Sequence, residues 1–432
     1  MKKIGVLVKN HSPILLKDQE CSSGKILKTR RYIPGIYLRE AITNQLLQGR
    51  SSLNRCFDQL FCDCHRWGME IVFPNCYPNL NAYTFPMLLP ATAKSCRWKP
   101  GFIEDSSVDE QHGVFDTLLN QIIFQQVLAF SIKSGRPSRS LTLIQDAYHR
   151  LIEQGTLYCN ICHEVANAYQ VEYAKPHGNF KQIPIRTYWQ QPESALSSSH
   201  ITAAAPFAHH RKQQQGRCIE FISERTWFLG FSFLPTSLVD LYKESLESIT
   251  HLGEGSGQRI GRVEITVREI EDHELSLRQR VLKLNQKYHR MQKEYSLGRT
   301  DALITVNIQS ETILRDQNGR PLTKLSSSFL AETIKRIYRQ IAGEDLSAEE
   351  AACQEVVSFS RPVYTGGWKS SREATIAIAR GSVFVFSFPS LSPKLFLALD
   401  HLEKHGLGEK RGEGYGQILI CDPFHLEVGG VV

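Results

Sequence analysis

A glycine-rich stretch near the C-terminus limits the fold more than any other feature of this sequence. Residues 405–416 hold five glycines, two basic residues and a tyrosine. Glycine accepts φ > 0 and lets another chain approach closely, so a polyanion can lie against such a loop. Residues 395–404 before it have helical periodicity and a strand pattern follows, whereas a nucleotide-binding loop needs the order strand, turn, helix. We interpret this stretch as a polyanion-binding loop, with a plain helix-to-strand connection as the alternative. Its candidate contact residues are Lys410, Arg411, Gly414 and Tyr415.

A second stretch of the same kind occupies residues 251–261, again between a helical pattern and a strand pattern. The two copies are roughly 150 residues apart, too far for solenoid repeats, whose periods are about 20–50 residues. The spacing predicts two related domains, each closing with a helix, a glycine-rich loop and a last strand. The candidate contact residues of this loop are Gly255, Gly257 and Arg259.

Composition narrows the class of protein. The chain has 432 residues, enough for two or three domains, with 41% hydrophobic and 22% charged residues, as in ordinary globular proteins. Its net charge of +7 permits a nucleic-acid partner without requiring one. No apolar run has the length of a membrane span, and Lys9 cuts the first apolar run too short for a signal peptide. We therefore expect a cytoplasmic protein whose eleven cysteines are thiols or metal ligands.

A basic segment precedes the first predicted helix. The sequence Ile33-Pro34-Gly35 predicts a turn, and helical spacing of apolar residues follows it. The start of a helix is a natural anion site, and basic residues crowd this one. A solvated basic loop is the alternative to phosphate binding. The candidate contact residues are Lys28, Arg30, Arg31, Tyr32, Gly35 and Arg39.

Residues 361–372 form a further candidate RNA contact, because they combine adjacent glycines with a tryptophan and two basic residues. An RNA base can stack on an indole while cations hold the neighbouring phosphates. The alternative is that the tryptophan lies in the core and the glycines form a bulge. The candidate residues are Gly367, Trp368, Lys369 and Arg372.

A Cys-x-x-Cys pair suggests a structural zinc site, because a two-residue gap lets one turn present both sulfurs to a single ion. We expect the ligands Cys96, His112, Cys159 and Cys162, with His163 as a reserve for the fourth position. Packed, reduced cysteines are the alternative. A catalytic zinc is disfavoured, because nothing nearby has the H-E-x-x-H pattern that supplies a general base.

An amphipathic helix is predicted between the two domains. Apolar residues from Leu277 to Tyr295 recur at three- and four-residue steps, and basic residues occupy the other faces. A solvated connecting helix is favoured over RNA contact. We therefore divide the chain into a first domain at 1–270, a helical connector at 271–300 and a second domain at 301–432.

These motifs, in this order, resemble the RAMP superfamily of CRISPR effector proteins. The resemblance covers essentially the whole chain: Tyr32-Ile-Pro-Gly35, both glycine-rich loops, and Gly367-Trp368 followed by the strand at 379–384. The cysteine and histidine set looks like that of the two-domain RAMP subunit of type III-D, cyanobacterial-type complexes. The resemblance implies an α+β fold of two ferredoxin-like βαββαβ domains. Residues 74–215 depart from the family as a long insertion in the first domain, carrying the metal ligands.

The resemblance implies two functions of different class. In the first, the protein is a non-catalytic subunit that holds CRISPR RNA, at its 5′ repeat-derived tag, beside other RAMP subunits, the large polymerase-like subunit and target RNA. In the second, it is an endoribonuclease of the effector backbone, in which Asp18, in a loop after the first strand, positions Mg²⁺ at the scissile phosphate of target RNA. A metal-dependent nuclease would be expected to hold more acidic residues near this loop, and Glu20 is the only one close to Asp18. We therefore favour the binding subunit. A metalloenzyme of other chemistry at the cysteine cluster is the least favoured reading.

Overall fold

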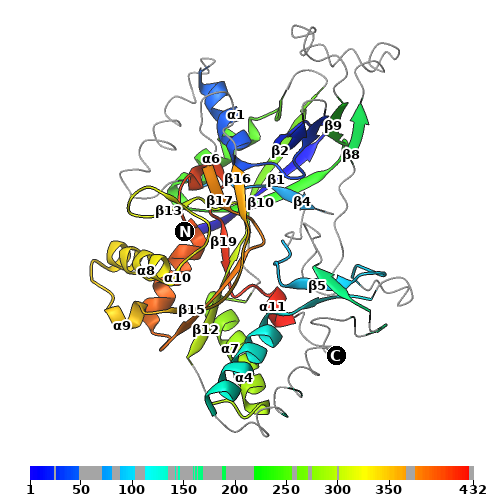
Figure 1. Cartoon of the computed structure of the whole chain (residues 1–432). Coiled ribbons are helices and arrows are strands. Elements are labelled where there is room, and N and C mark those ends of the chain that lie inside the picture. Colours follow the sequence, from blue (N-terminus) through cyan, green and yellow to red (C-terminus); the bar gives the residue numbers. More distant parts are fainter. Residues whose placement is uncertain are drawn as a thin grey trace.

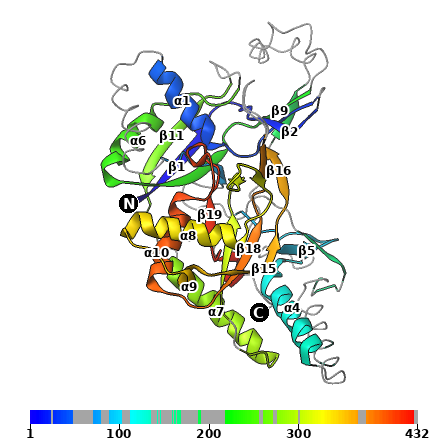
Figure 2. The ribbon, with the colours of Figure 1, turned by 60° about the vertical axis from the view of Figure 1, so that its left-hand side comes forward.

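The chain forms two mixed α/β lobes in the computed structural model (Figures 1 and 2). The structure describes residues 1–23, 26–47, 71–79, 88–102, 112–134, 142, 145, 159, 161–162, 164–168, 187–190, 218–254, 260–270, 275–298, 301–365 and 375–427. Within these residues, every helix is too short or too polar to cross a lipid bilayer.

The first domain is built on a four-stranded antiparallel sheet. Its strands are β1 (Lys2–Asn10), β4 (Tyr77–Asn79), β10 (Trp227–Leu234) and β11 (Val263–Glu269), in the spatial order β11-β1-β10-β4. Helices α1 (Gly35–Leu47) and α6 (Val239–Glu247) follow the first and third of these strands. The chain order is therefore βαββαβ, and alternate residues of β1, including Ile4 and Val6, pack against Leu38 and Tyr242 of the helices.

A smaller sheet lies beside this domain and changes one expectation. It contains β2 (Lys17–Ser23), β3 (Ile26–Thr29), β8 (Thr187–Gln190) and β9 (Cys218–Ile222), in the order β2-β3-β9-β8. Asp18 lies on β2, paired with Lys28, so the loop position expected for a catalytic aspartate is wrong. The reason is that the buried Leu16 and the bridge between Ile14 and Ile222 lead the chain directly into this sheet.

The second domain repeats the same topology. Its sheet has the order β15-β18-β12-β19, with β12 (Ala302–Ile308), β15 (Gln354–Phe359), β18 (Val383–Phe388) and β19 (Ile418–Ile420). Helices α8 (Ser327–Ala342) and α10 (Pro393–His405) follow the first and third strands. Both domains are therefore ferredoxin-like, as expected. The shorter elements are β13 (Leu314–Arg315), β14 (Pro321–Leu322), β16 (Pro362–Thr365), β17 (Thr375–Ile378), α9 (Ala348–Ala351) and α11 (Phe424–Glu427).

Local sequence explains where the helices of the second domain begin and end. The hydroxyl of Ser326 accepts a hydrogen bond from the Phe329 N–H at the start of α8, and Ser392 caps α10 in the same way. Gly343 ends α8 in a left-handed conformation, with φ of 71°. Such caps supply partners for backbone groups that a helix end leaves without one.

The connecting helix α7 (Leu277–Glu294) packs its apolar stripe into the core of the second domain, while basic residues on its other faces, such as Arg278 and Lys283, are exposed. Its residues Val281, Leu284 and Tyr288 are fully buried. Arg280 is buried as well and makes two hydrogen bonds of 2.6 Å to the Glu403 carboxylate on α10. The helix contacts β12, β19, α10 and α11 of the second domain.

The segment expected as an insertion in the first domain packs on the second domain. Its helix α4 (Leu118–Ser134) lies beside α7 (Figure 1), and Gln126 donates a hydrogen bond to the Tyr288 hydroxyl. The strands β5 (Ala93–Cys96), β6 (Val114–Asp116) and β7 (Ala166–Ala168) form its small sheet. Strand β4 falls inside the expected insertion range 74–215, although it pairs with β10 in the main sheet of the first domain.

A buried polar network fastens the inserted segment to α11. The His425 imidazole lies 2.9 Å from the Asp116 carboxylate, and the Thr92 hydroxyl donates to the same carboxylate at 2.6 Å. The second ring nitrogen of His425 lies 2.9 Å from the amide of Asn307 on β12. Burial alone would lower the pKa of His425, but Asp116 outweighs it and holds that pKa above its ordinary value.

Candidate functional site

The C-terminal glycine-rich loop is a rigid structure that depends on its glycines. It links α10 to β19, and Gly406, Gly414 and Gly416 all have positive φ. The Leu407 N–H donates to the Gly416 carbonyl at 2.8 Å, and a Cβ on Gly416 would lie only 2.0 Å from the Leu407 oxygen. No other residue could fold the loop back on itself this closely.

The loop docks against the first domain, at the Ile33-Pro34-Gly35 turn. The side chain of Asn75 joins the two: its oxygen accepts from the Gly35 N–H at 2.8 Å, and its nitrogen donates to the Gly414 carbonyl at 3.0 Å. Arg39 lies 3.4 Å from Glu413 of the loop. Two motifs predicted separately, almost 400 residues apart in the chain, therefore form one inter-domain structure.

This docking corrects the anion site expected at the start of α1. Gly35 is buried, and its N–H already bonds the Asn75 side chain. A Cβ at Gly35 would lie 1.9 Å from the Phe73 carbonyl oxygen, so no space remains at this glycine for a phosphate. The glycine serves close packing between the domains.

A charged cluster lies beside the docked loop. Glu311 accepts from the Tyr32 hydroxyl at 3.2 Å, and Arg30 donates to the same hydroxyl at 2.9 Å. The Arg380 guanidinium lies 3.8 Å from Glu311 and 4.5 Å above the Tyr32 ring. Burial would raise the pKa of Glu311, but Arg380 and Arg30 outweigh it and hold that pKa below its ordinary value. The cluster therefore holds one buried carboxylate between two guanidiniums.

The remaining expected contact residues fall into three groups. Tyr32 is 3% exposed, and its ring is covered by Arg380, so it supports the cluster and cannot offer an open stacking face. Exposed or half-buried side chains that can still reach a polyanion are Lys28, Arg30, Arg31, Arg39, Lys410, Arg411 and Tyr415. Residues that lie outside the described part of the chain are Gly255, Gly257, Arg259, Gly367, Trp368, Lys369 and Arg372.

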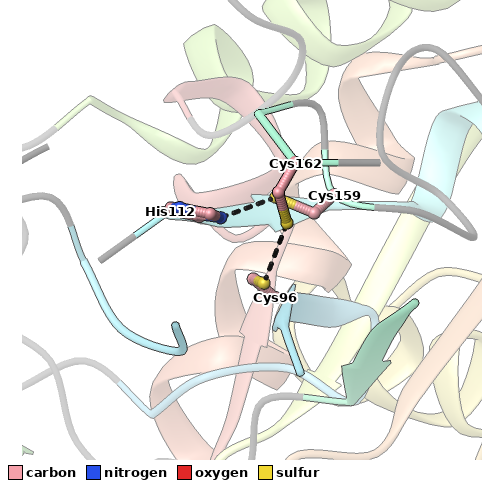
Figure 3. Close-up of side chains that lie close together, drawn as sticks. All are labelled: Cys96, His112, Cys159 and Cys162. Carbon is pink, nitrogen blue, oxygen red and sulfur yellow. Dashed lines mark hydrogen bonds between the residues drawn. The ribbon is translucent and has the colours of Figure 1, made fainter. Parts of the chain in front are cut away.

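The expected metal ligands lie together in the inserted segment (Figure 3). One ligand atom from each of Cys96, His112, Cys159 and Cys162 lies within 4.8 Å of all the others. The Cys96 and Cys162 sulfurs are 3.6 Å apart, and Cys159 Sγ is 3.3 Å from His112 Nδ1. A tetrahedral zinc ion with Zn–S bonds of about 2.3 Å separates its sulfurs by about 3.8 Å, close to this spacing.

The backbone around the cluster suits thiolate ligands. The Lys99 N–H points to Cys96 Sγ at 3.5 Å, and the Ile161 N–H points to Cys159 Sγ at 3.4 Å. Burial would raise the pKa of Cys96, but the N–H groups of the following turn outweigh it and lower that pKa. Four protein ligands fill a tetrahedral coordination shell, which is typical of a structural metal site.

No protein-family model and no curated protein matches the chain. Among solved structures, it is similar to a RAMP protein binding different RNA substrates, with a TM-score of 0.34 and 10% identity over 97% of this chain and 99% of that one. A CRISPR-associated Cas6 protein gives 0.33 and 10% over 97% and 98% of the two chains. A Cas6-related protein from Pyrococcus furiosus gives 0.28 and 11% over 78% and 98%. The strand order of the two sheets defines the ferredoxin-like fold.

Sequence reasoning missed the residues that hold this site together. Asn75 and Glu311 belong to no recognisable motif, and Arg380 lies in the strand pattern at 379–384, which gives no sign of its partners. Asn75 directly follows Phe73-Pro74, which by itself indicates only a turn. The sequence did hold one sign of this docking. A glycine-rich loop and a Pro-Gly turn both favour close approach of backbones, so the two could have been expected to meet.

Proposed function

We propose that this protein is a non-catalytic, RNA-binding RAMP-type subunit of a CRISPR type III effector complex, as the sequence resemblance implies. The single observation that carries the proposal is the docking of the C-terminal glycine loop on the Ile33-Pro34-Gly35 turn. The docking brings Arg30, Arg380, Lys410 and Arg411 to the junction of two ferredoxin-like domains. RNA recognition relies on such cations together with backbone groups at close approach.

The guide RNA is the proposed ligand, held at its 5′ repeat-derived tag. Phosphates would lie against Arg30 and Arg380 beside Glu311, and against Lys410 and Arg411 of the loop. The rigid loop suits this role because a preorganised surface spends little conformational entropy on binding. Other RAMP subunits and the large polymerase-like subunit would be the protein partners in the cytoplasm.

Zinc is the proposed metal of the Cys96, His112, Cys159 and Cys162 cluster. Three thiolates and one imidazole in a compact set favour a soft or borderline divalent ion with tetrahedral preference. The metal would hold the inserted segment in the shape that docks on α7 and α11. Nothing observed at Asp18 favours the endoribonuclease, because its strand position differs from the loop that the nuclease requires.

The test of this function compares two RNAs of equal length. The full chain would be titrated with a guide RNA that begins with the repeat-derived tag and with one whose tag sequence is scrambled. Tighter binding of the tagged RNA supports the proposal. Equal binding of both would leave RNA binding in place and overturn tag recognition, and no binding of either would overturn the function.

A further inference from the structure

A cavity of about 370 Å³ lies between the first domain's sheet and the second domain. Its volume falls in the range of small-molecule sites, about 300–1,000 Å³. Strand β10 forms one wall through Leu229, Phe231 and Phe233. The other wall comes from the end of α10, the glycine-rich loop and β19, and includes Lys404, Tyr415 and Gln417.

The β10 wall is an aromatic surface on the face of the sheet that the helices do not cover. Side chains alternate along a strand, so Phe228 and Leu234 enter the helix-covered core while Phe231 and Phe233 face the cavity. These two rings pack edge to face with centroids 5.8 Å apart. Phe231 is still 37% exposed, although it stands on a central strand. Together with Phe233, its ring gives the cavity an apolar aromatic wall.

Two ammonium groups flank these rings. Lys3 Nζ lies 5.1 Å from the centroid of Phe231, and Lys404 Nζ lies 6.0 Å from that of Phe233. The charged side chains that line the cavity are Lys3, Arg280 and Lys404 against Asp400 and Glu403. Arg280 pairs with Glu403, and Lys404 pairs with Asp400 at 2.6 Å. Lys404 and Asp400 are 35% and 42% exposed, so they mark the opening to solvent, where an anionic group would compete with Asp400 for Lys404.

Amide side chains complete the lining. Gln309 and Gln417 both line the cavity, and the Gln309 amide nitrogen donates to Asp422 at 3.2 Å. An amide presents a donor and an acceptor at once. The edge of a nucleobase presents the same mixture, and proteins read unpaired RNA bases by stacking on aromatic rings and bonding to their edges. Gly406 and Tyr415 of the glycine-rich loop line the cavity too, so it is continuous with the proposed RNA surface.

We propose that this cavity accepts one unpaired base of a single-stranded RNA that lies along the glycine-rich loop. The base stacks against Phe231 and Phe233, its edge faces Gln417, and its phosphate lies at the opening near Lys3 and Lys404. This inference rests on the proposed RNA-binding function and assigns one recognition site within it.

The test uses the full chain and single-stranded RNAs of about 12 nucleotides, each with 4-thiouridine at one position. We expect photocrosslinking from one position to the peptide that contains Phe231. We also expect Phe231→Ala to weaken RNA binding by about 5- to 100-fold without changing its salt dependence, since stacking involves no counterion release. The matched control is Leu282→Ala on α7, which removes another exposed apolar side chain outside the cavity and should bind like the unmodified protein.

The results distinguish a failure of the base site from a failure of the proposed RNA-binding function. Tight RNA binding without a crosslink to the β10 peptide, and with full affinity in Phe231→Ala, overturns the base site and leaves RNA binding intact. A failure of the unmodified chain to bind any RNA overturns both. If Phe231→Ala does not fold, Phe231→Leu keeps an apolar side chain while removing the ring, and the crosslink on the unmodified chain needs no variant.

Discussion

The side-chain nitrogen of Asn75 in the first domain donates a hydrogen bond of 3.0 Å to the carbonyl oxygen of Gly414 in the second. The same amide holds the N–H of Gly35, so one residue fixes the glycine-rich loop to the turn that begins α1. The relative position of the two domains therefore depends on a contact that tolerates no Cβ on either glycine.

Gly414→Ala is expected to lower the free energy of unfolding by about 2–4 kcal/mol. The new Cβ would lie 2.3 Å from the Asn75 oxygen, and φ at this position is 90°. Gly319→Ala is the matched control, because its φ is 76° with nothing within 4 Å of the new Cβ, so it carries the backbone strain alone. Its expected cost is about 1 kcal/mol. Urea denaturation measures both, and equal losses would contradict the docking contact.

Glu403→Ala is expected to destabilise the second domain by about 3–5 kcal/mol, because it leaves Arg280 buried without its carboxylate. The two side chains are 17% and 6% exposed. Asp345→Ala breaks a surface pair with Arg339, in which both side chains are about 70% exposed, and should cost far less. If both variants lost a comparable free energy of unfolding, the buried Arg280–Glu403 pair would stabilise the domain no more than a surface pair does.

Removal of the metal is expected to release the inserted segment from the second domain. A strong chelator, or Cys159→Ser, should lower the free energy of unfolding by roughly 3 kcal/mol or more and expose α4 to proteolysis. Elemental analysis should find one zinc ion per chain in the unmodified protein. Cys353→Ser changes a half-buried thiol outside the cluster and should retain the metal. Full stability without bound metal would contradict a structural site.

Acidification is expected to destabilise the protein through His405. Burial, with further contributions from His401 and Arg411, lowers the pKa of His405 to about 3. The unfolded chain takes up a proton near pH 6.5 and the folded chain does not, so stability is present above about pH 6.5 and is lost as the pH falls toward 3. Between about pH 7.5 and 5.5, His405→Gln should lose about 1 kcal/mol less than the unmodified protein. Urea titrations at the two pH values measure this, and parallel losses would contradict the assignment.

Local patterns in the sequence predicted helices and the glycine-rich loop between α10 and β19, whereas the α+β fold of two ferredoxin-like domains was expected from the resemblance. The helical pattern at residues 395–404 is observed as Pro393–His405, since its periodicity and caps are local. The elements that cover the apolar stripe of α7 could not be predicted, because the stripe gives no information about α4, which comes from a segment roughly 150 residues earlier. The cluster of Arg30 with Glu311 could not be predicted either, because the two residues lie some 280 positions apart in sequence.

The measurement that tests the central claim most directly is the salt dependence of RNA binding by a double variant of the glycine-rich loop. Lys410→Ala with Arg411→Ala should weaken binding and reduce the slope of log K against log salt by about 1.4, the value for two lost single-strand phosphate contacts. Lys335→Ala with Arg336→Ala on α8 removes the same charge from another surface and should leave the slope unchanged. An unchanged slope in the loop variant, or an equal change in both, would contradict the loop as the RNA-binding surface.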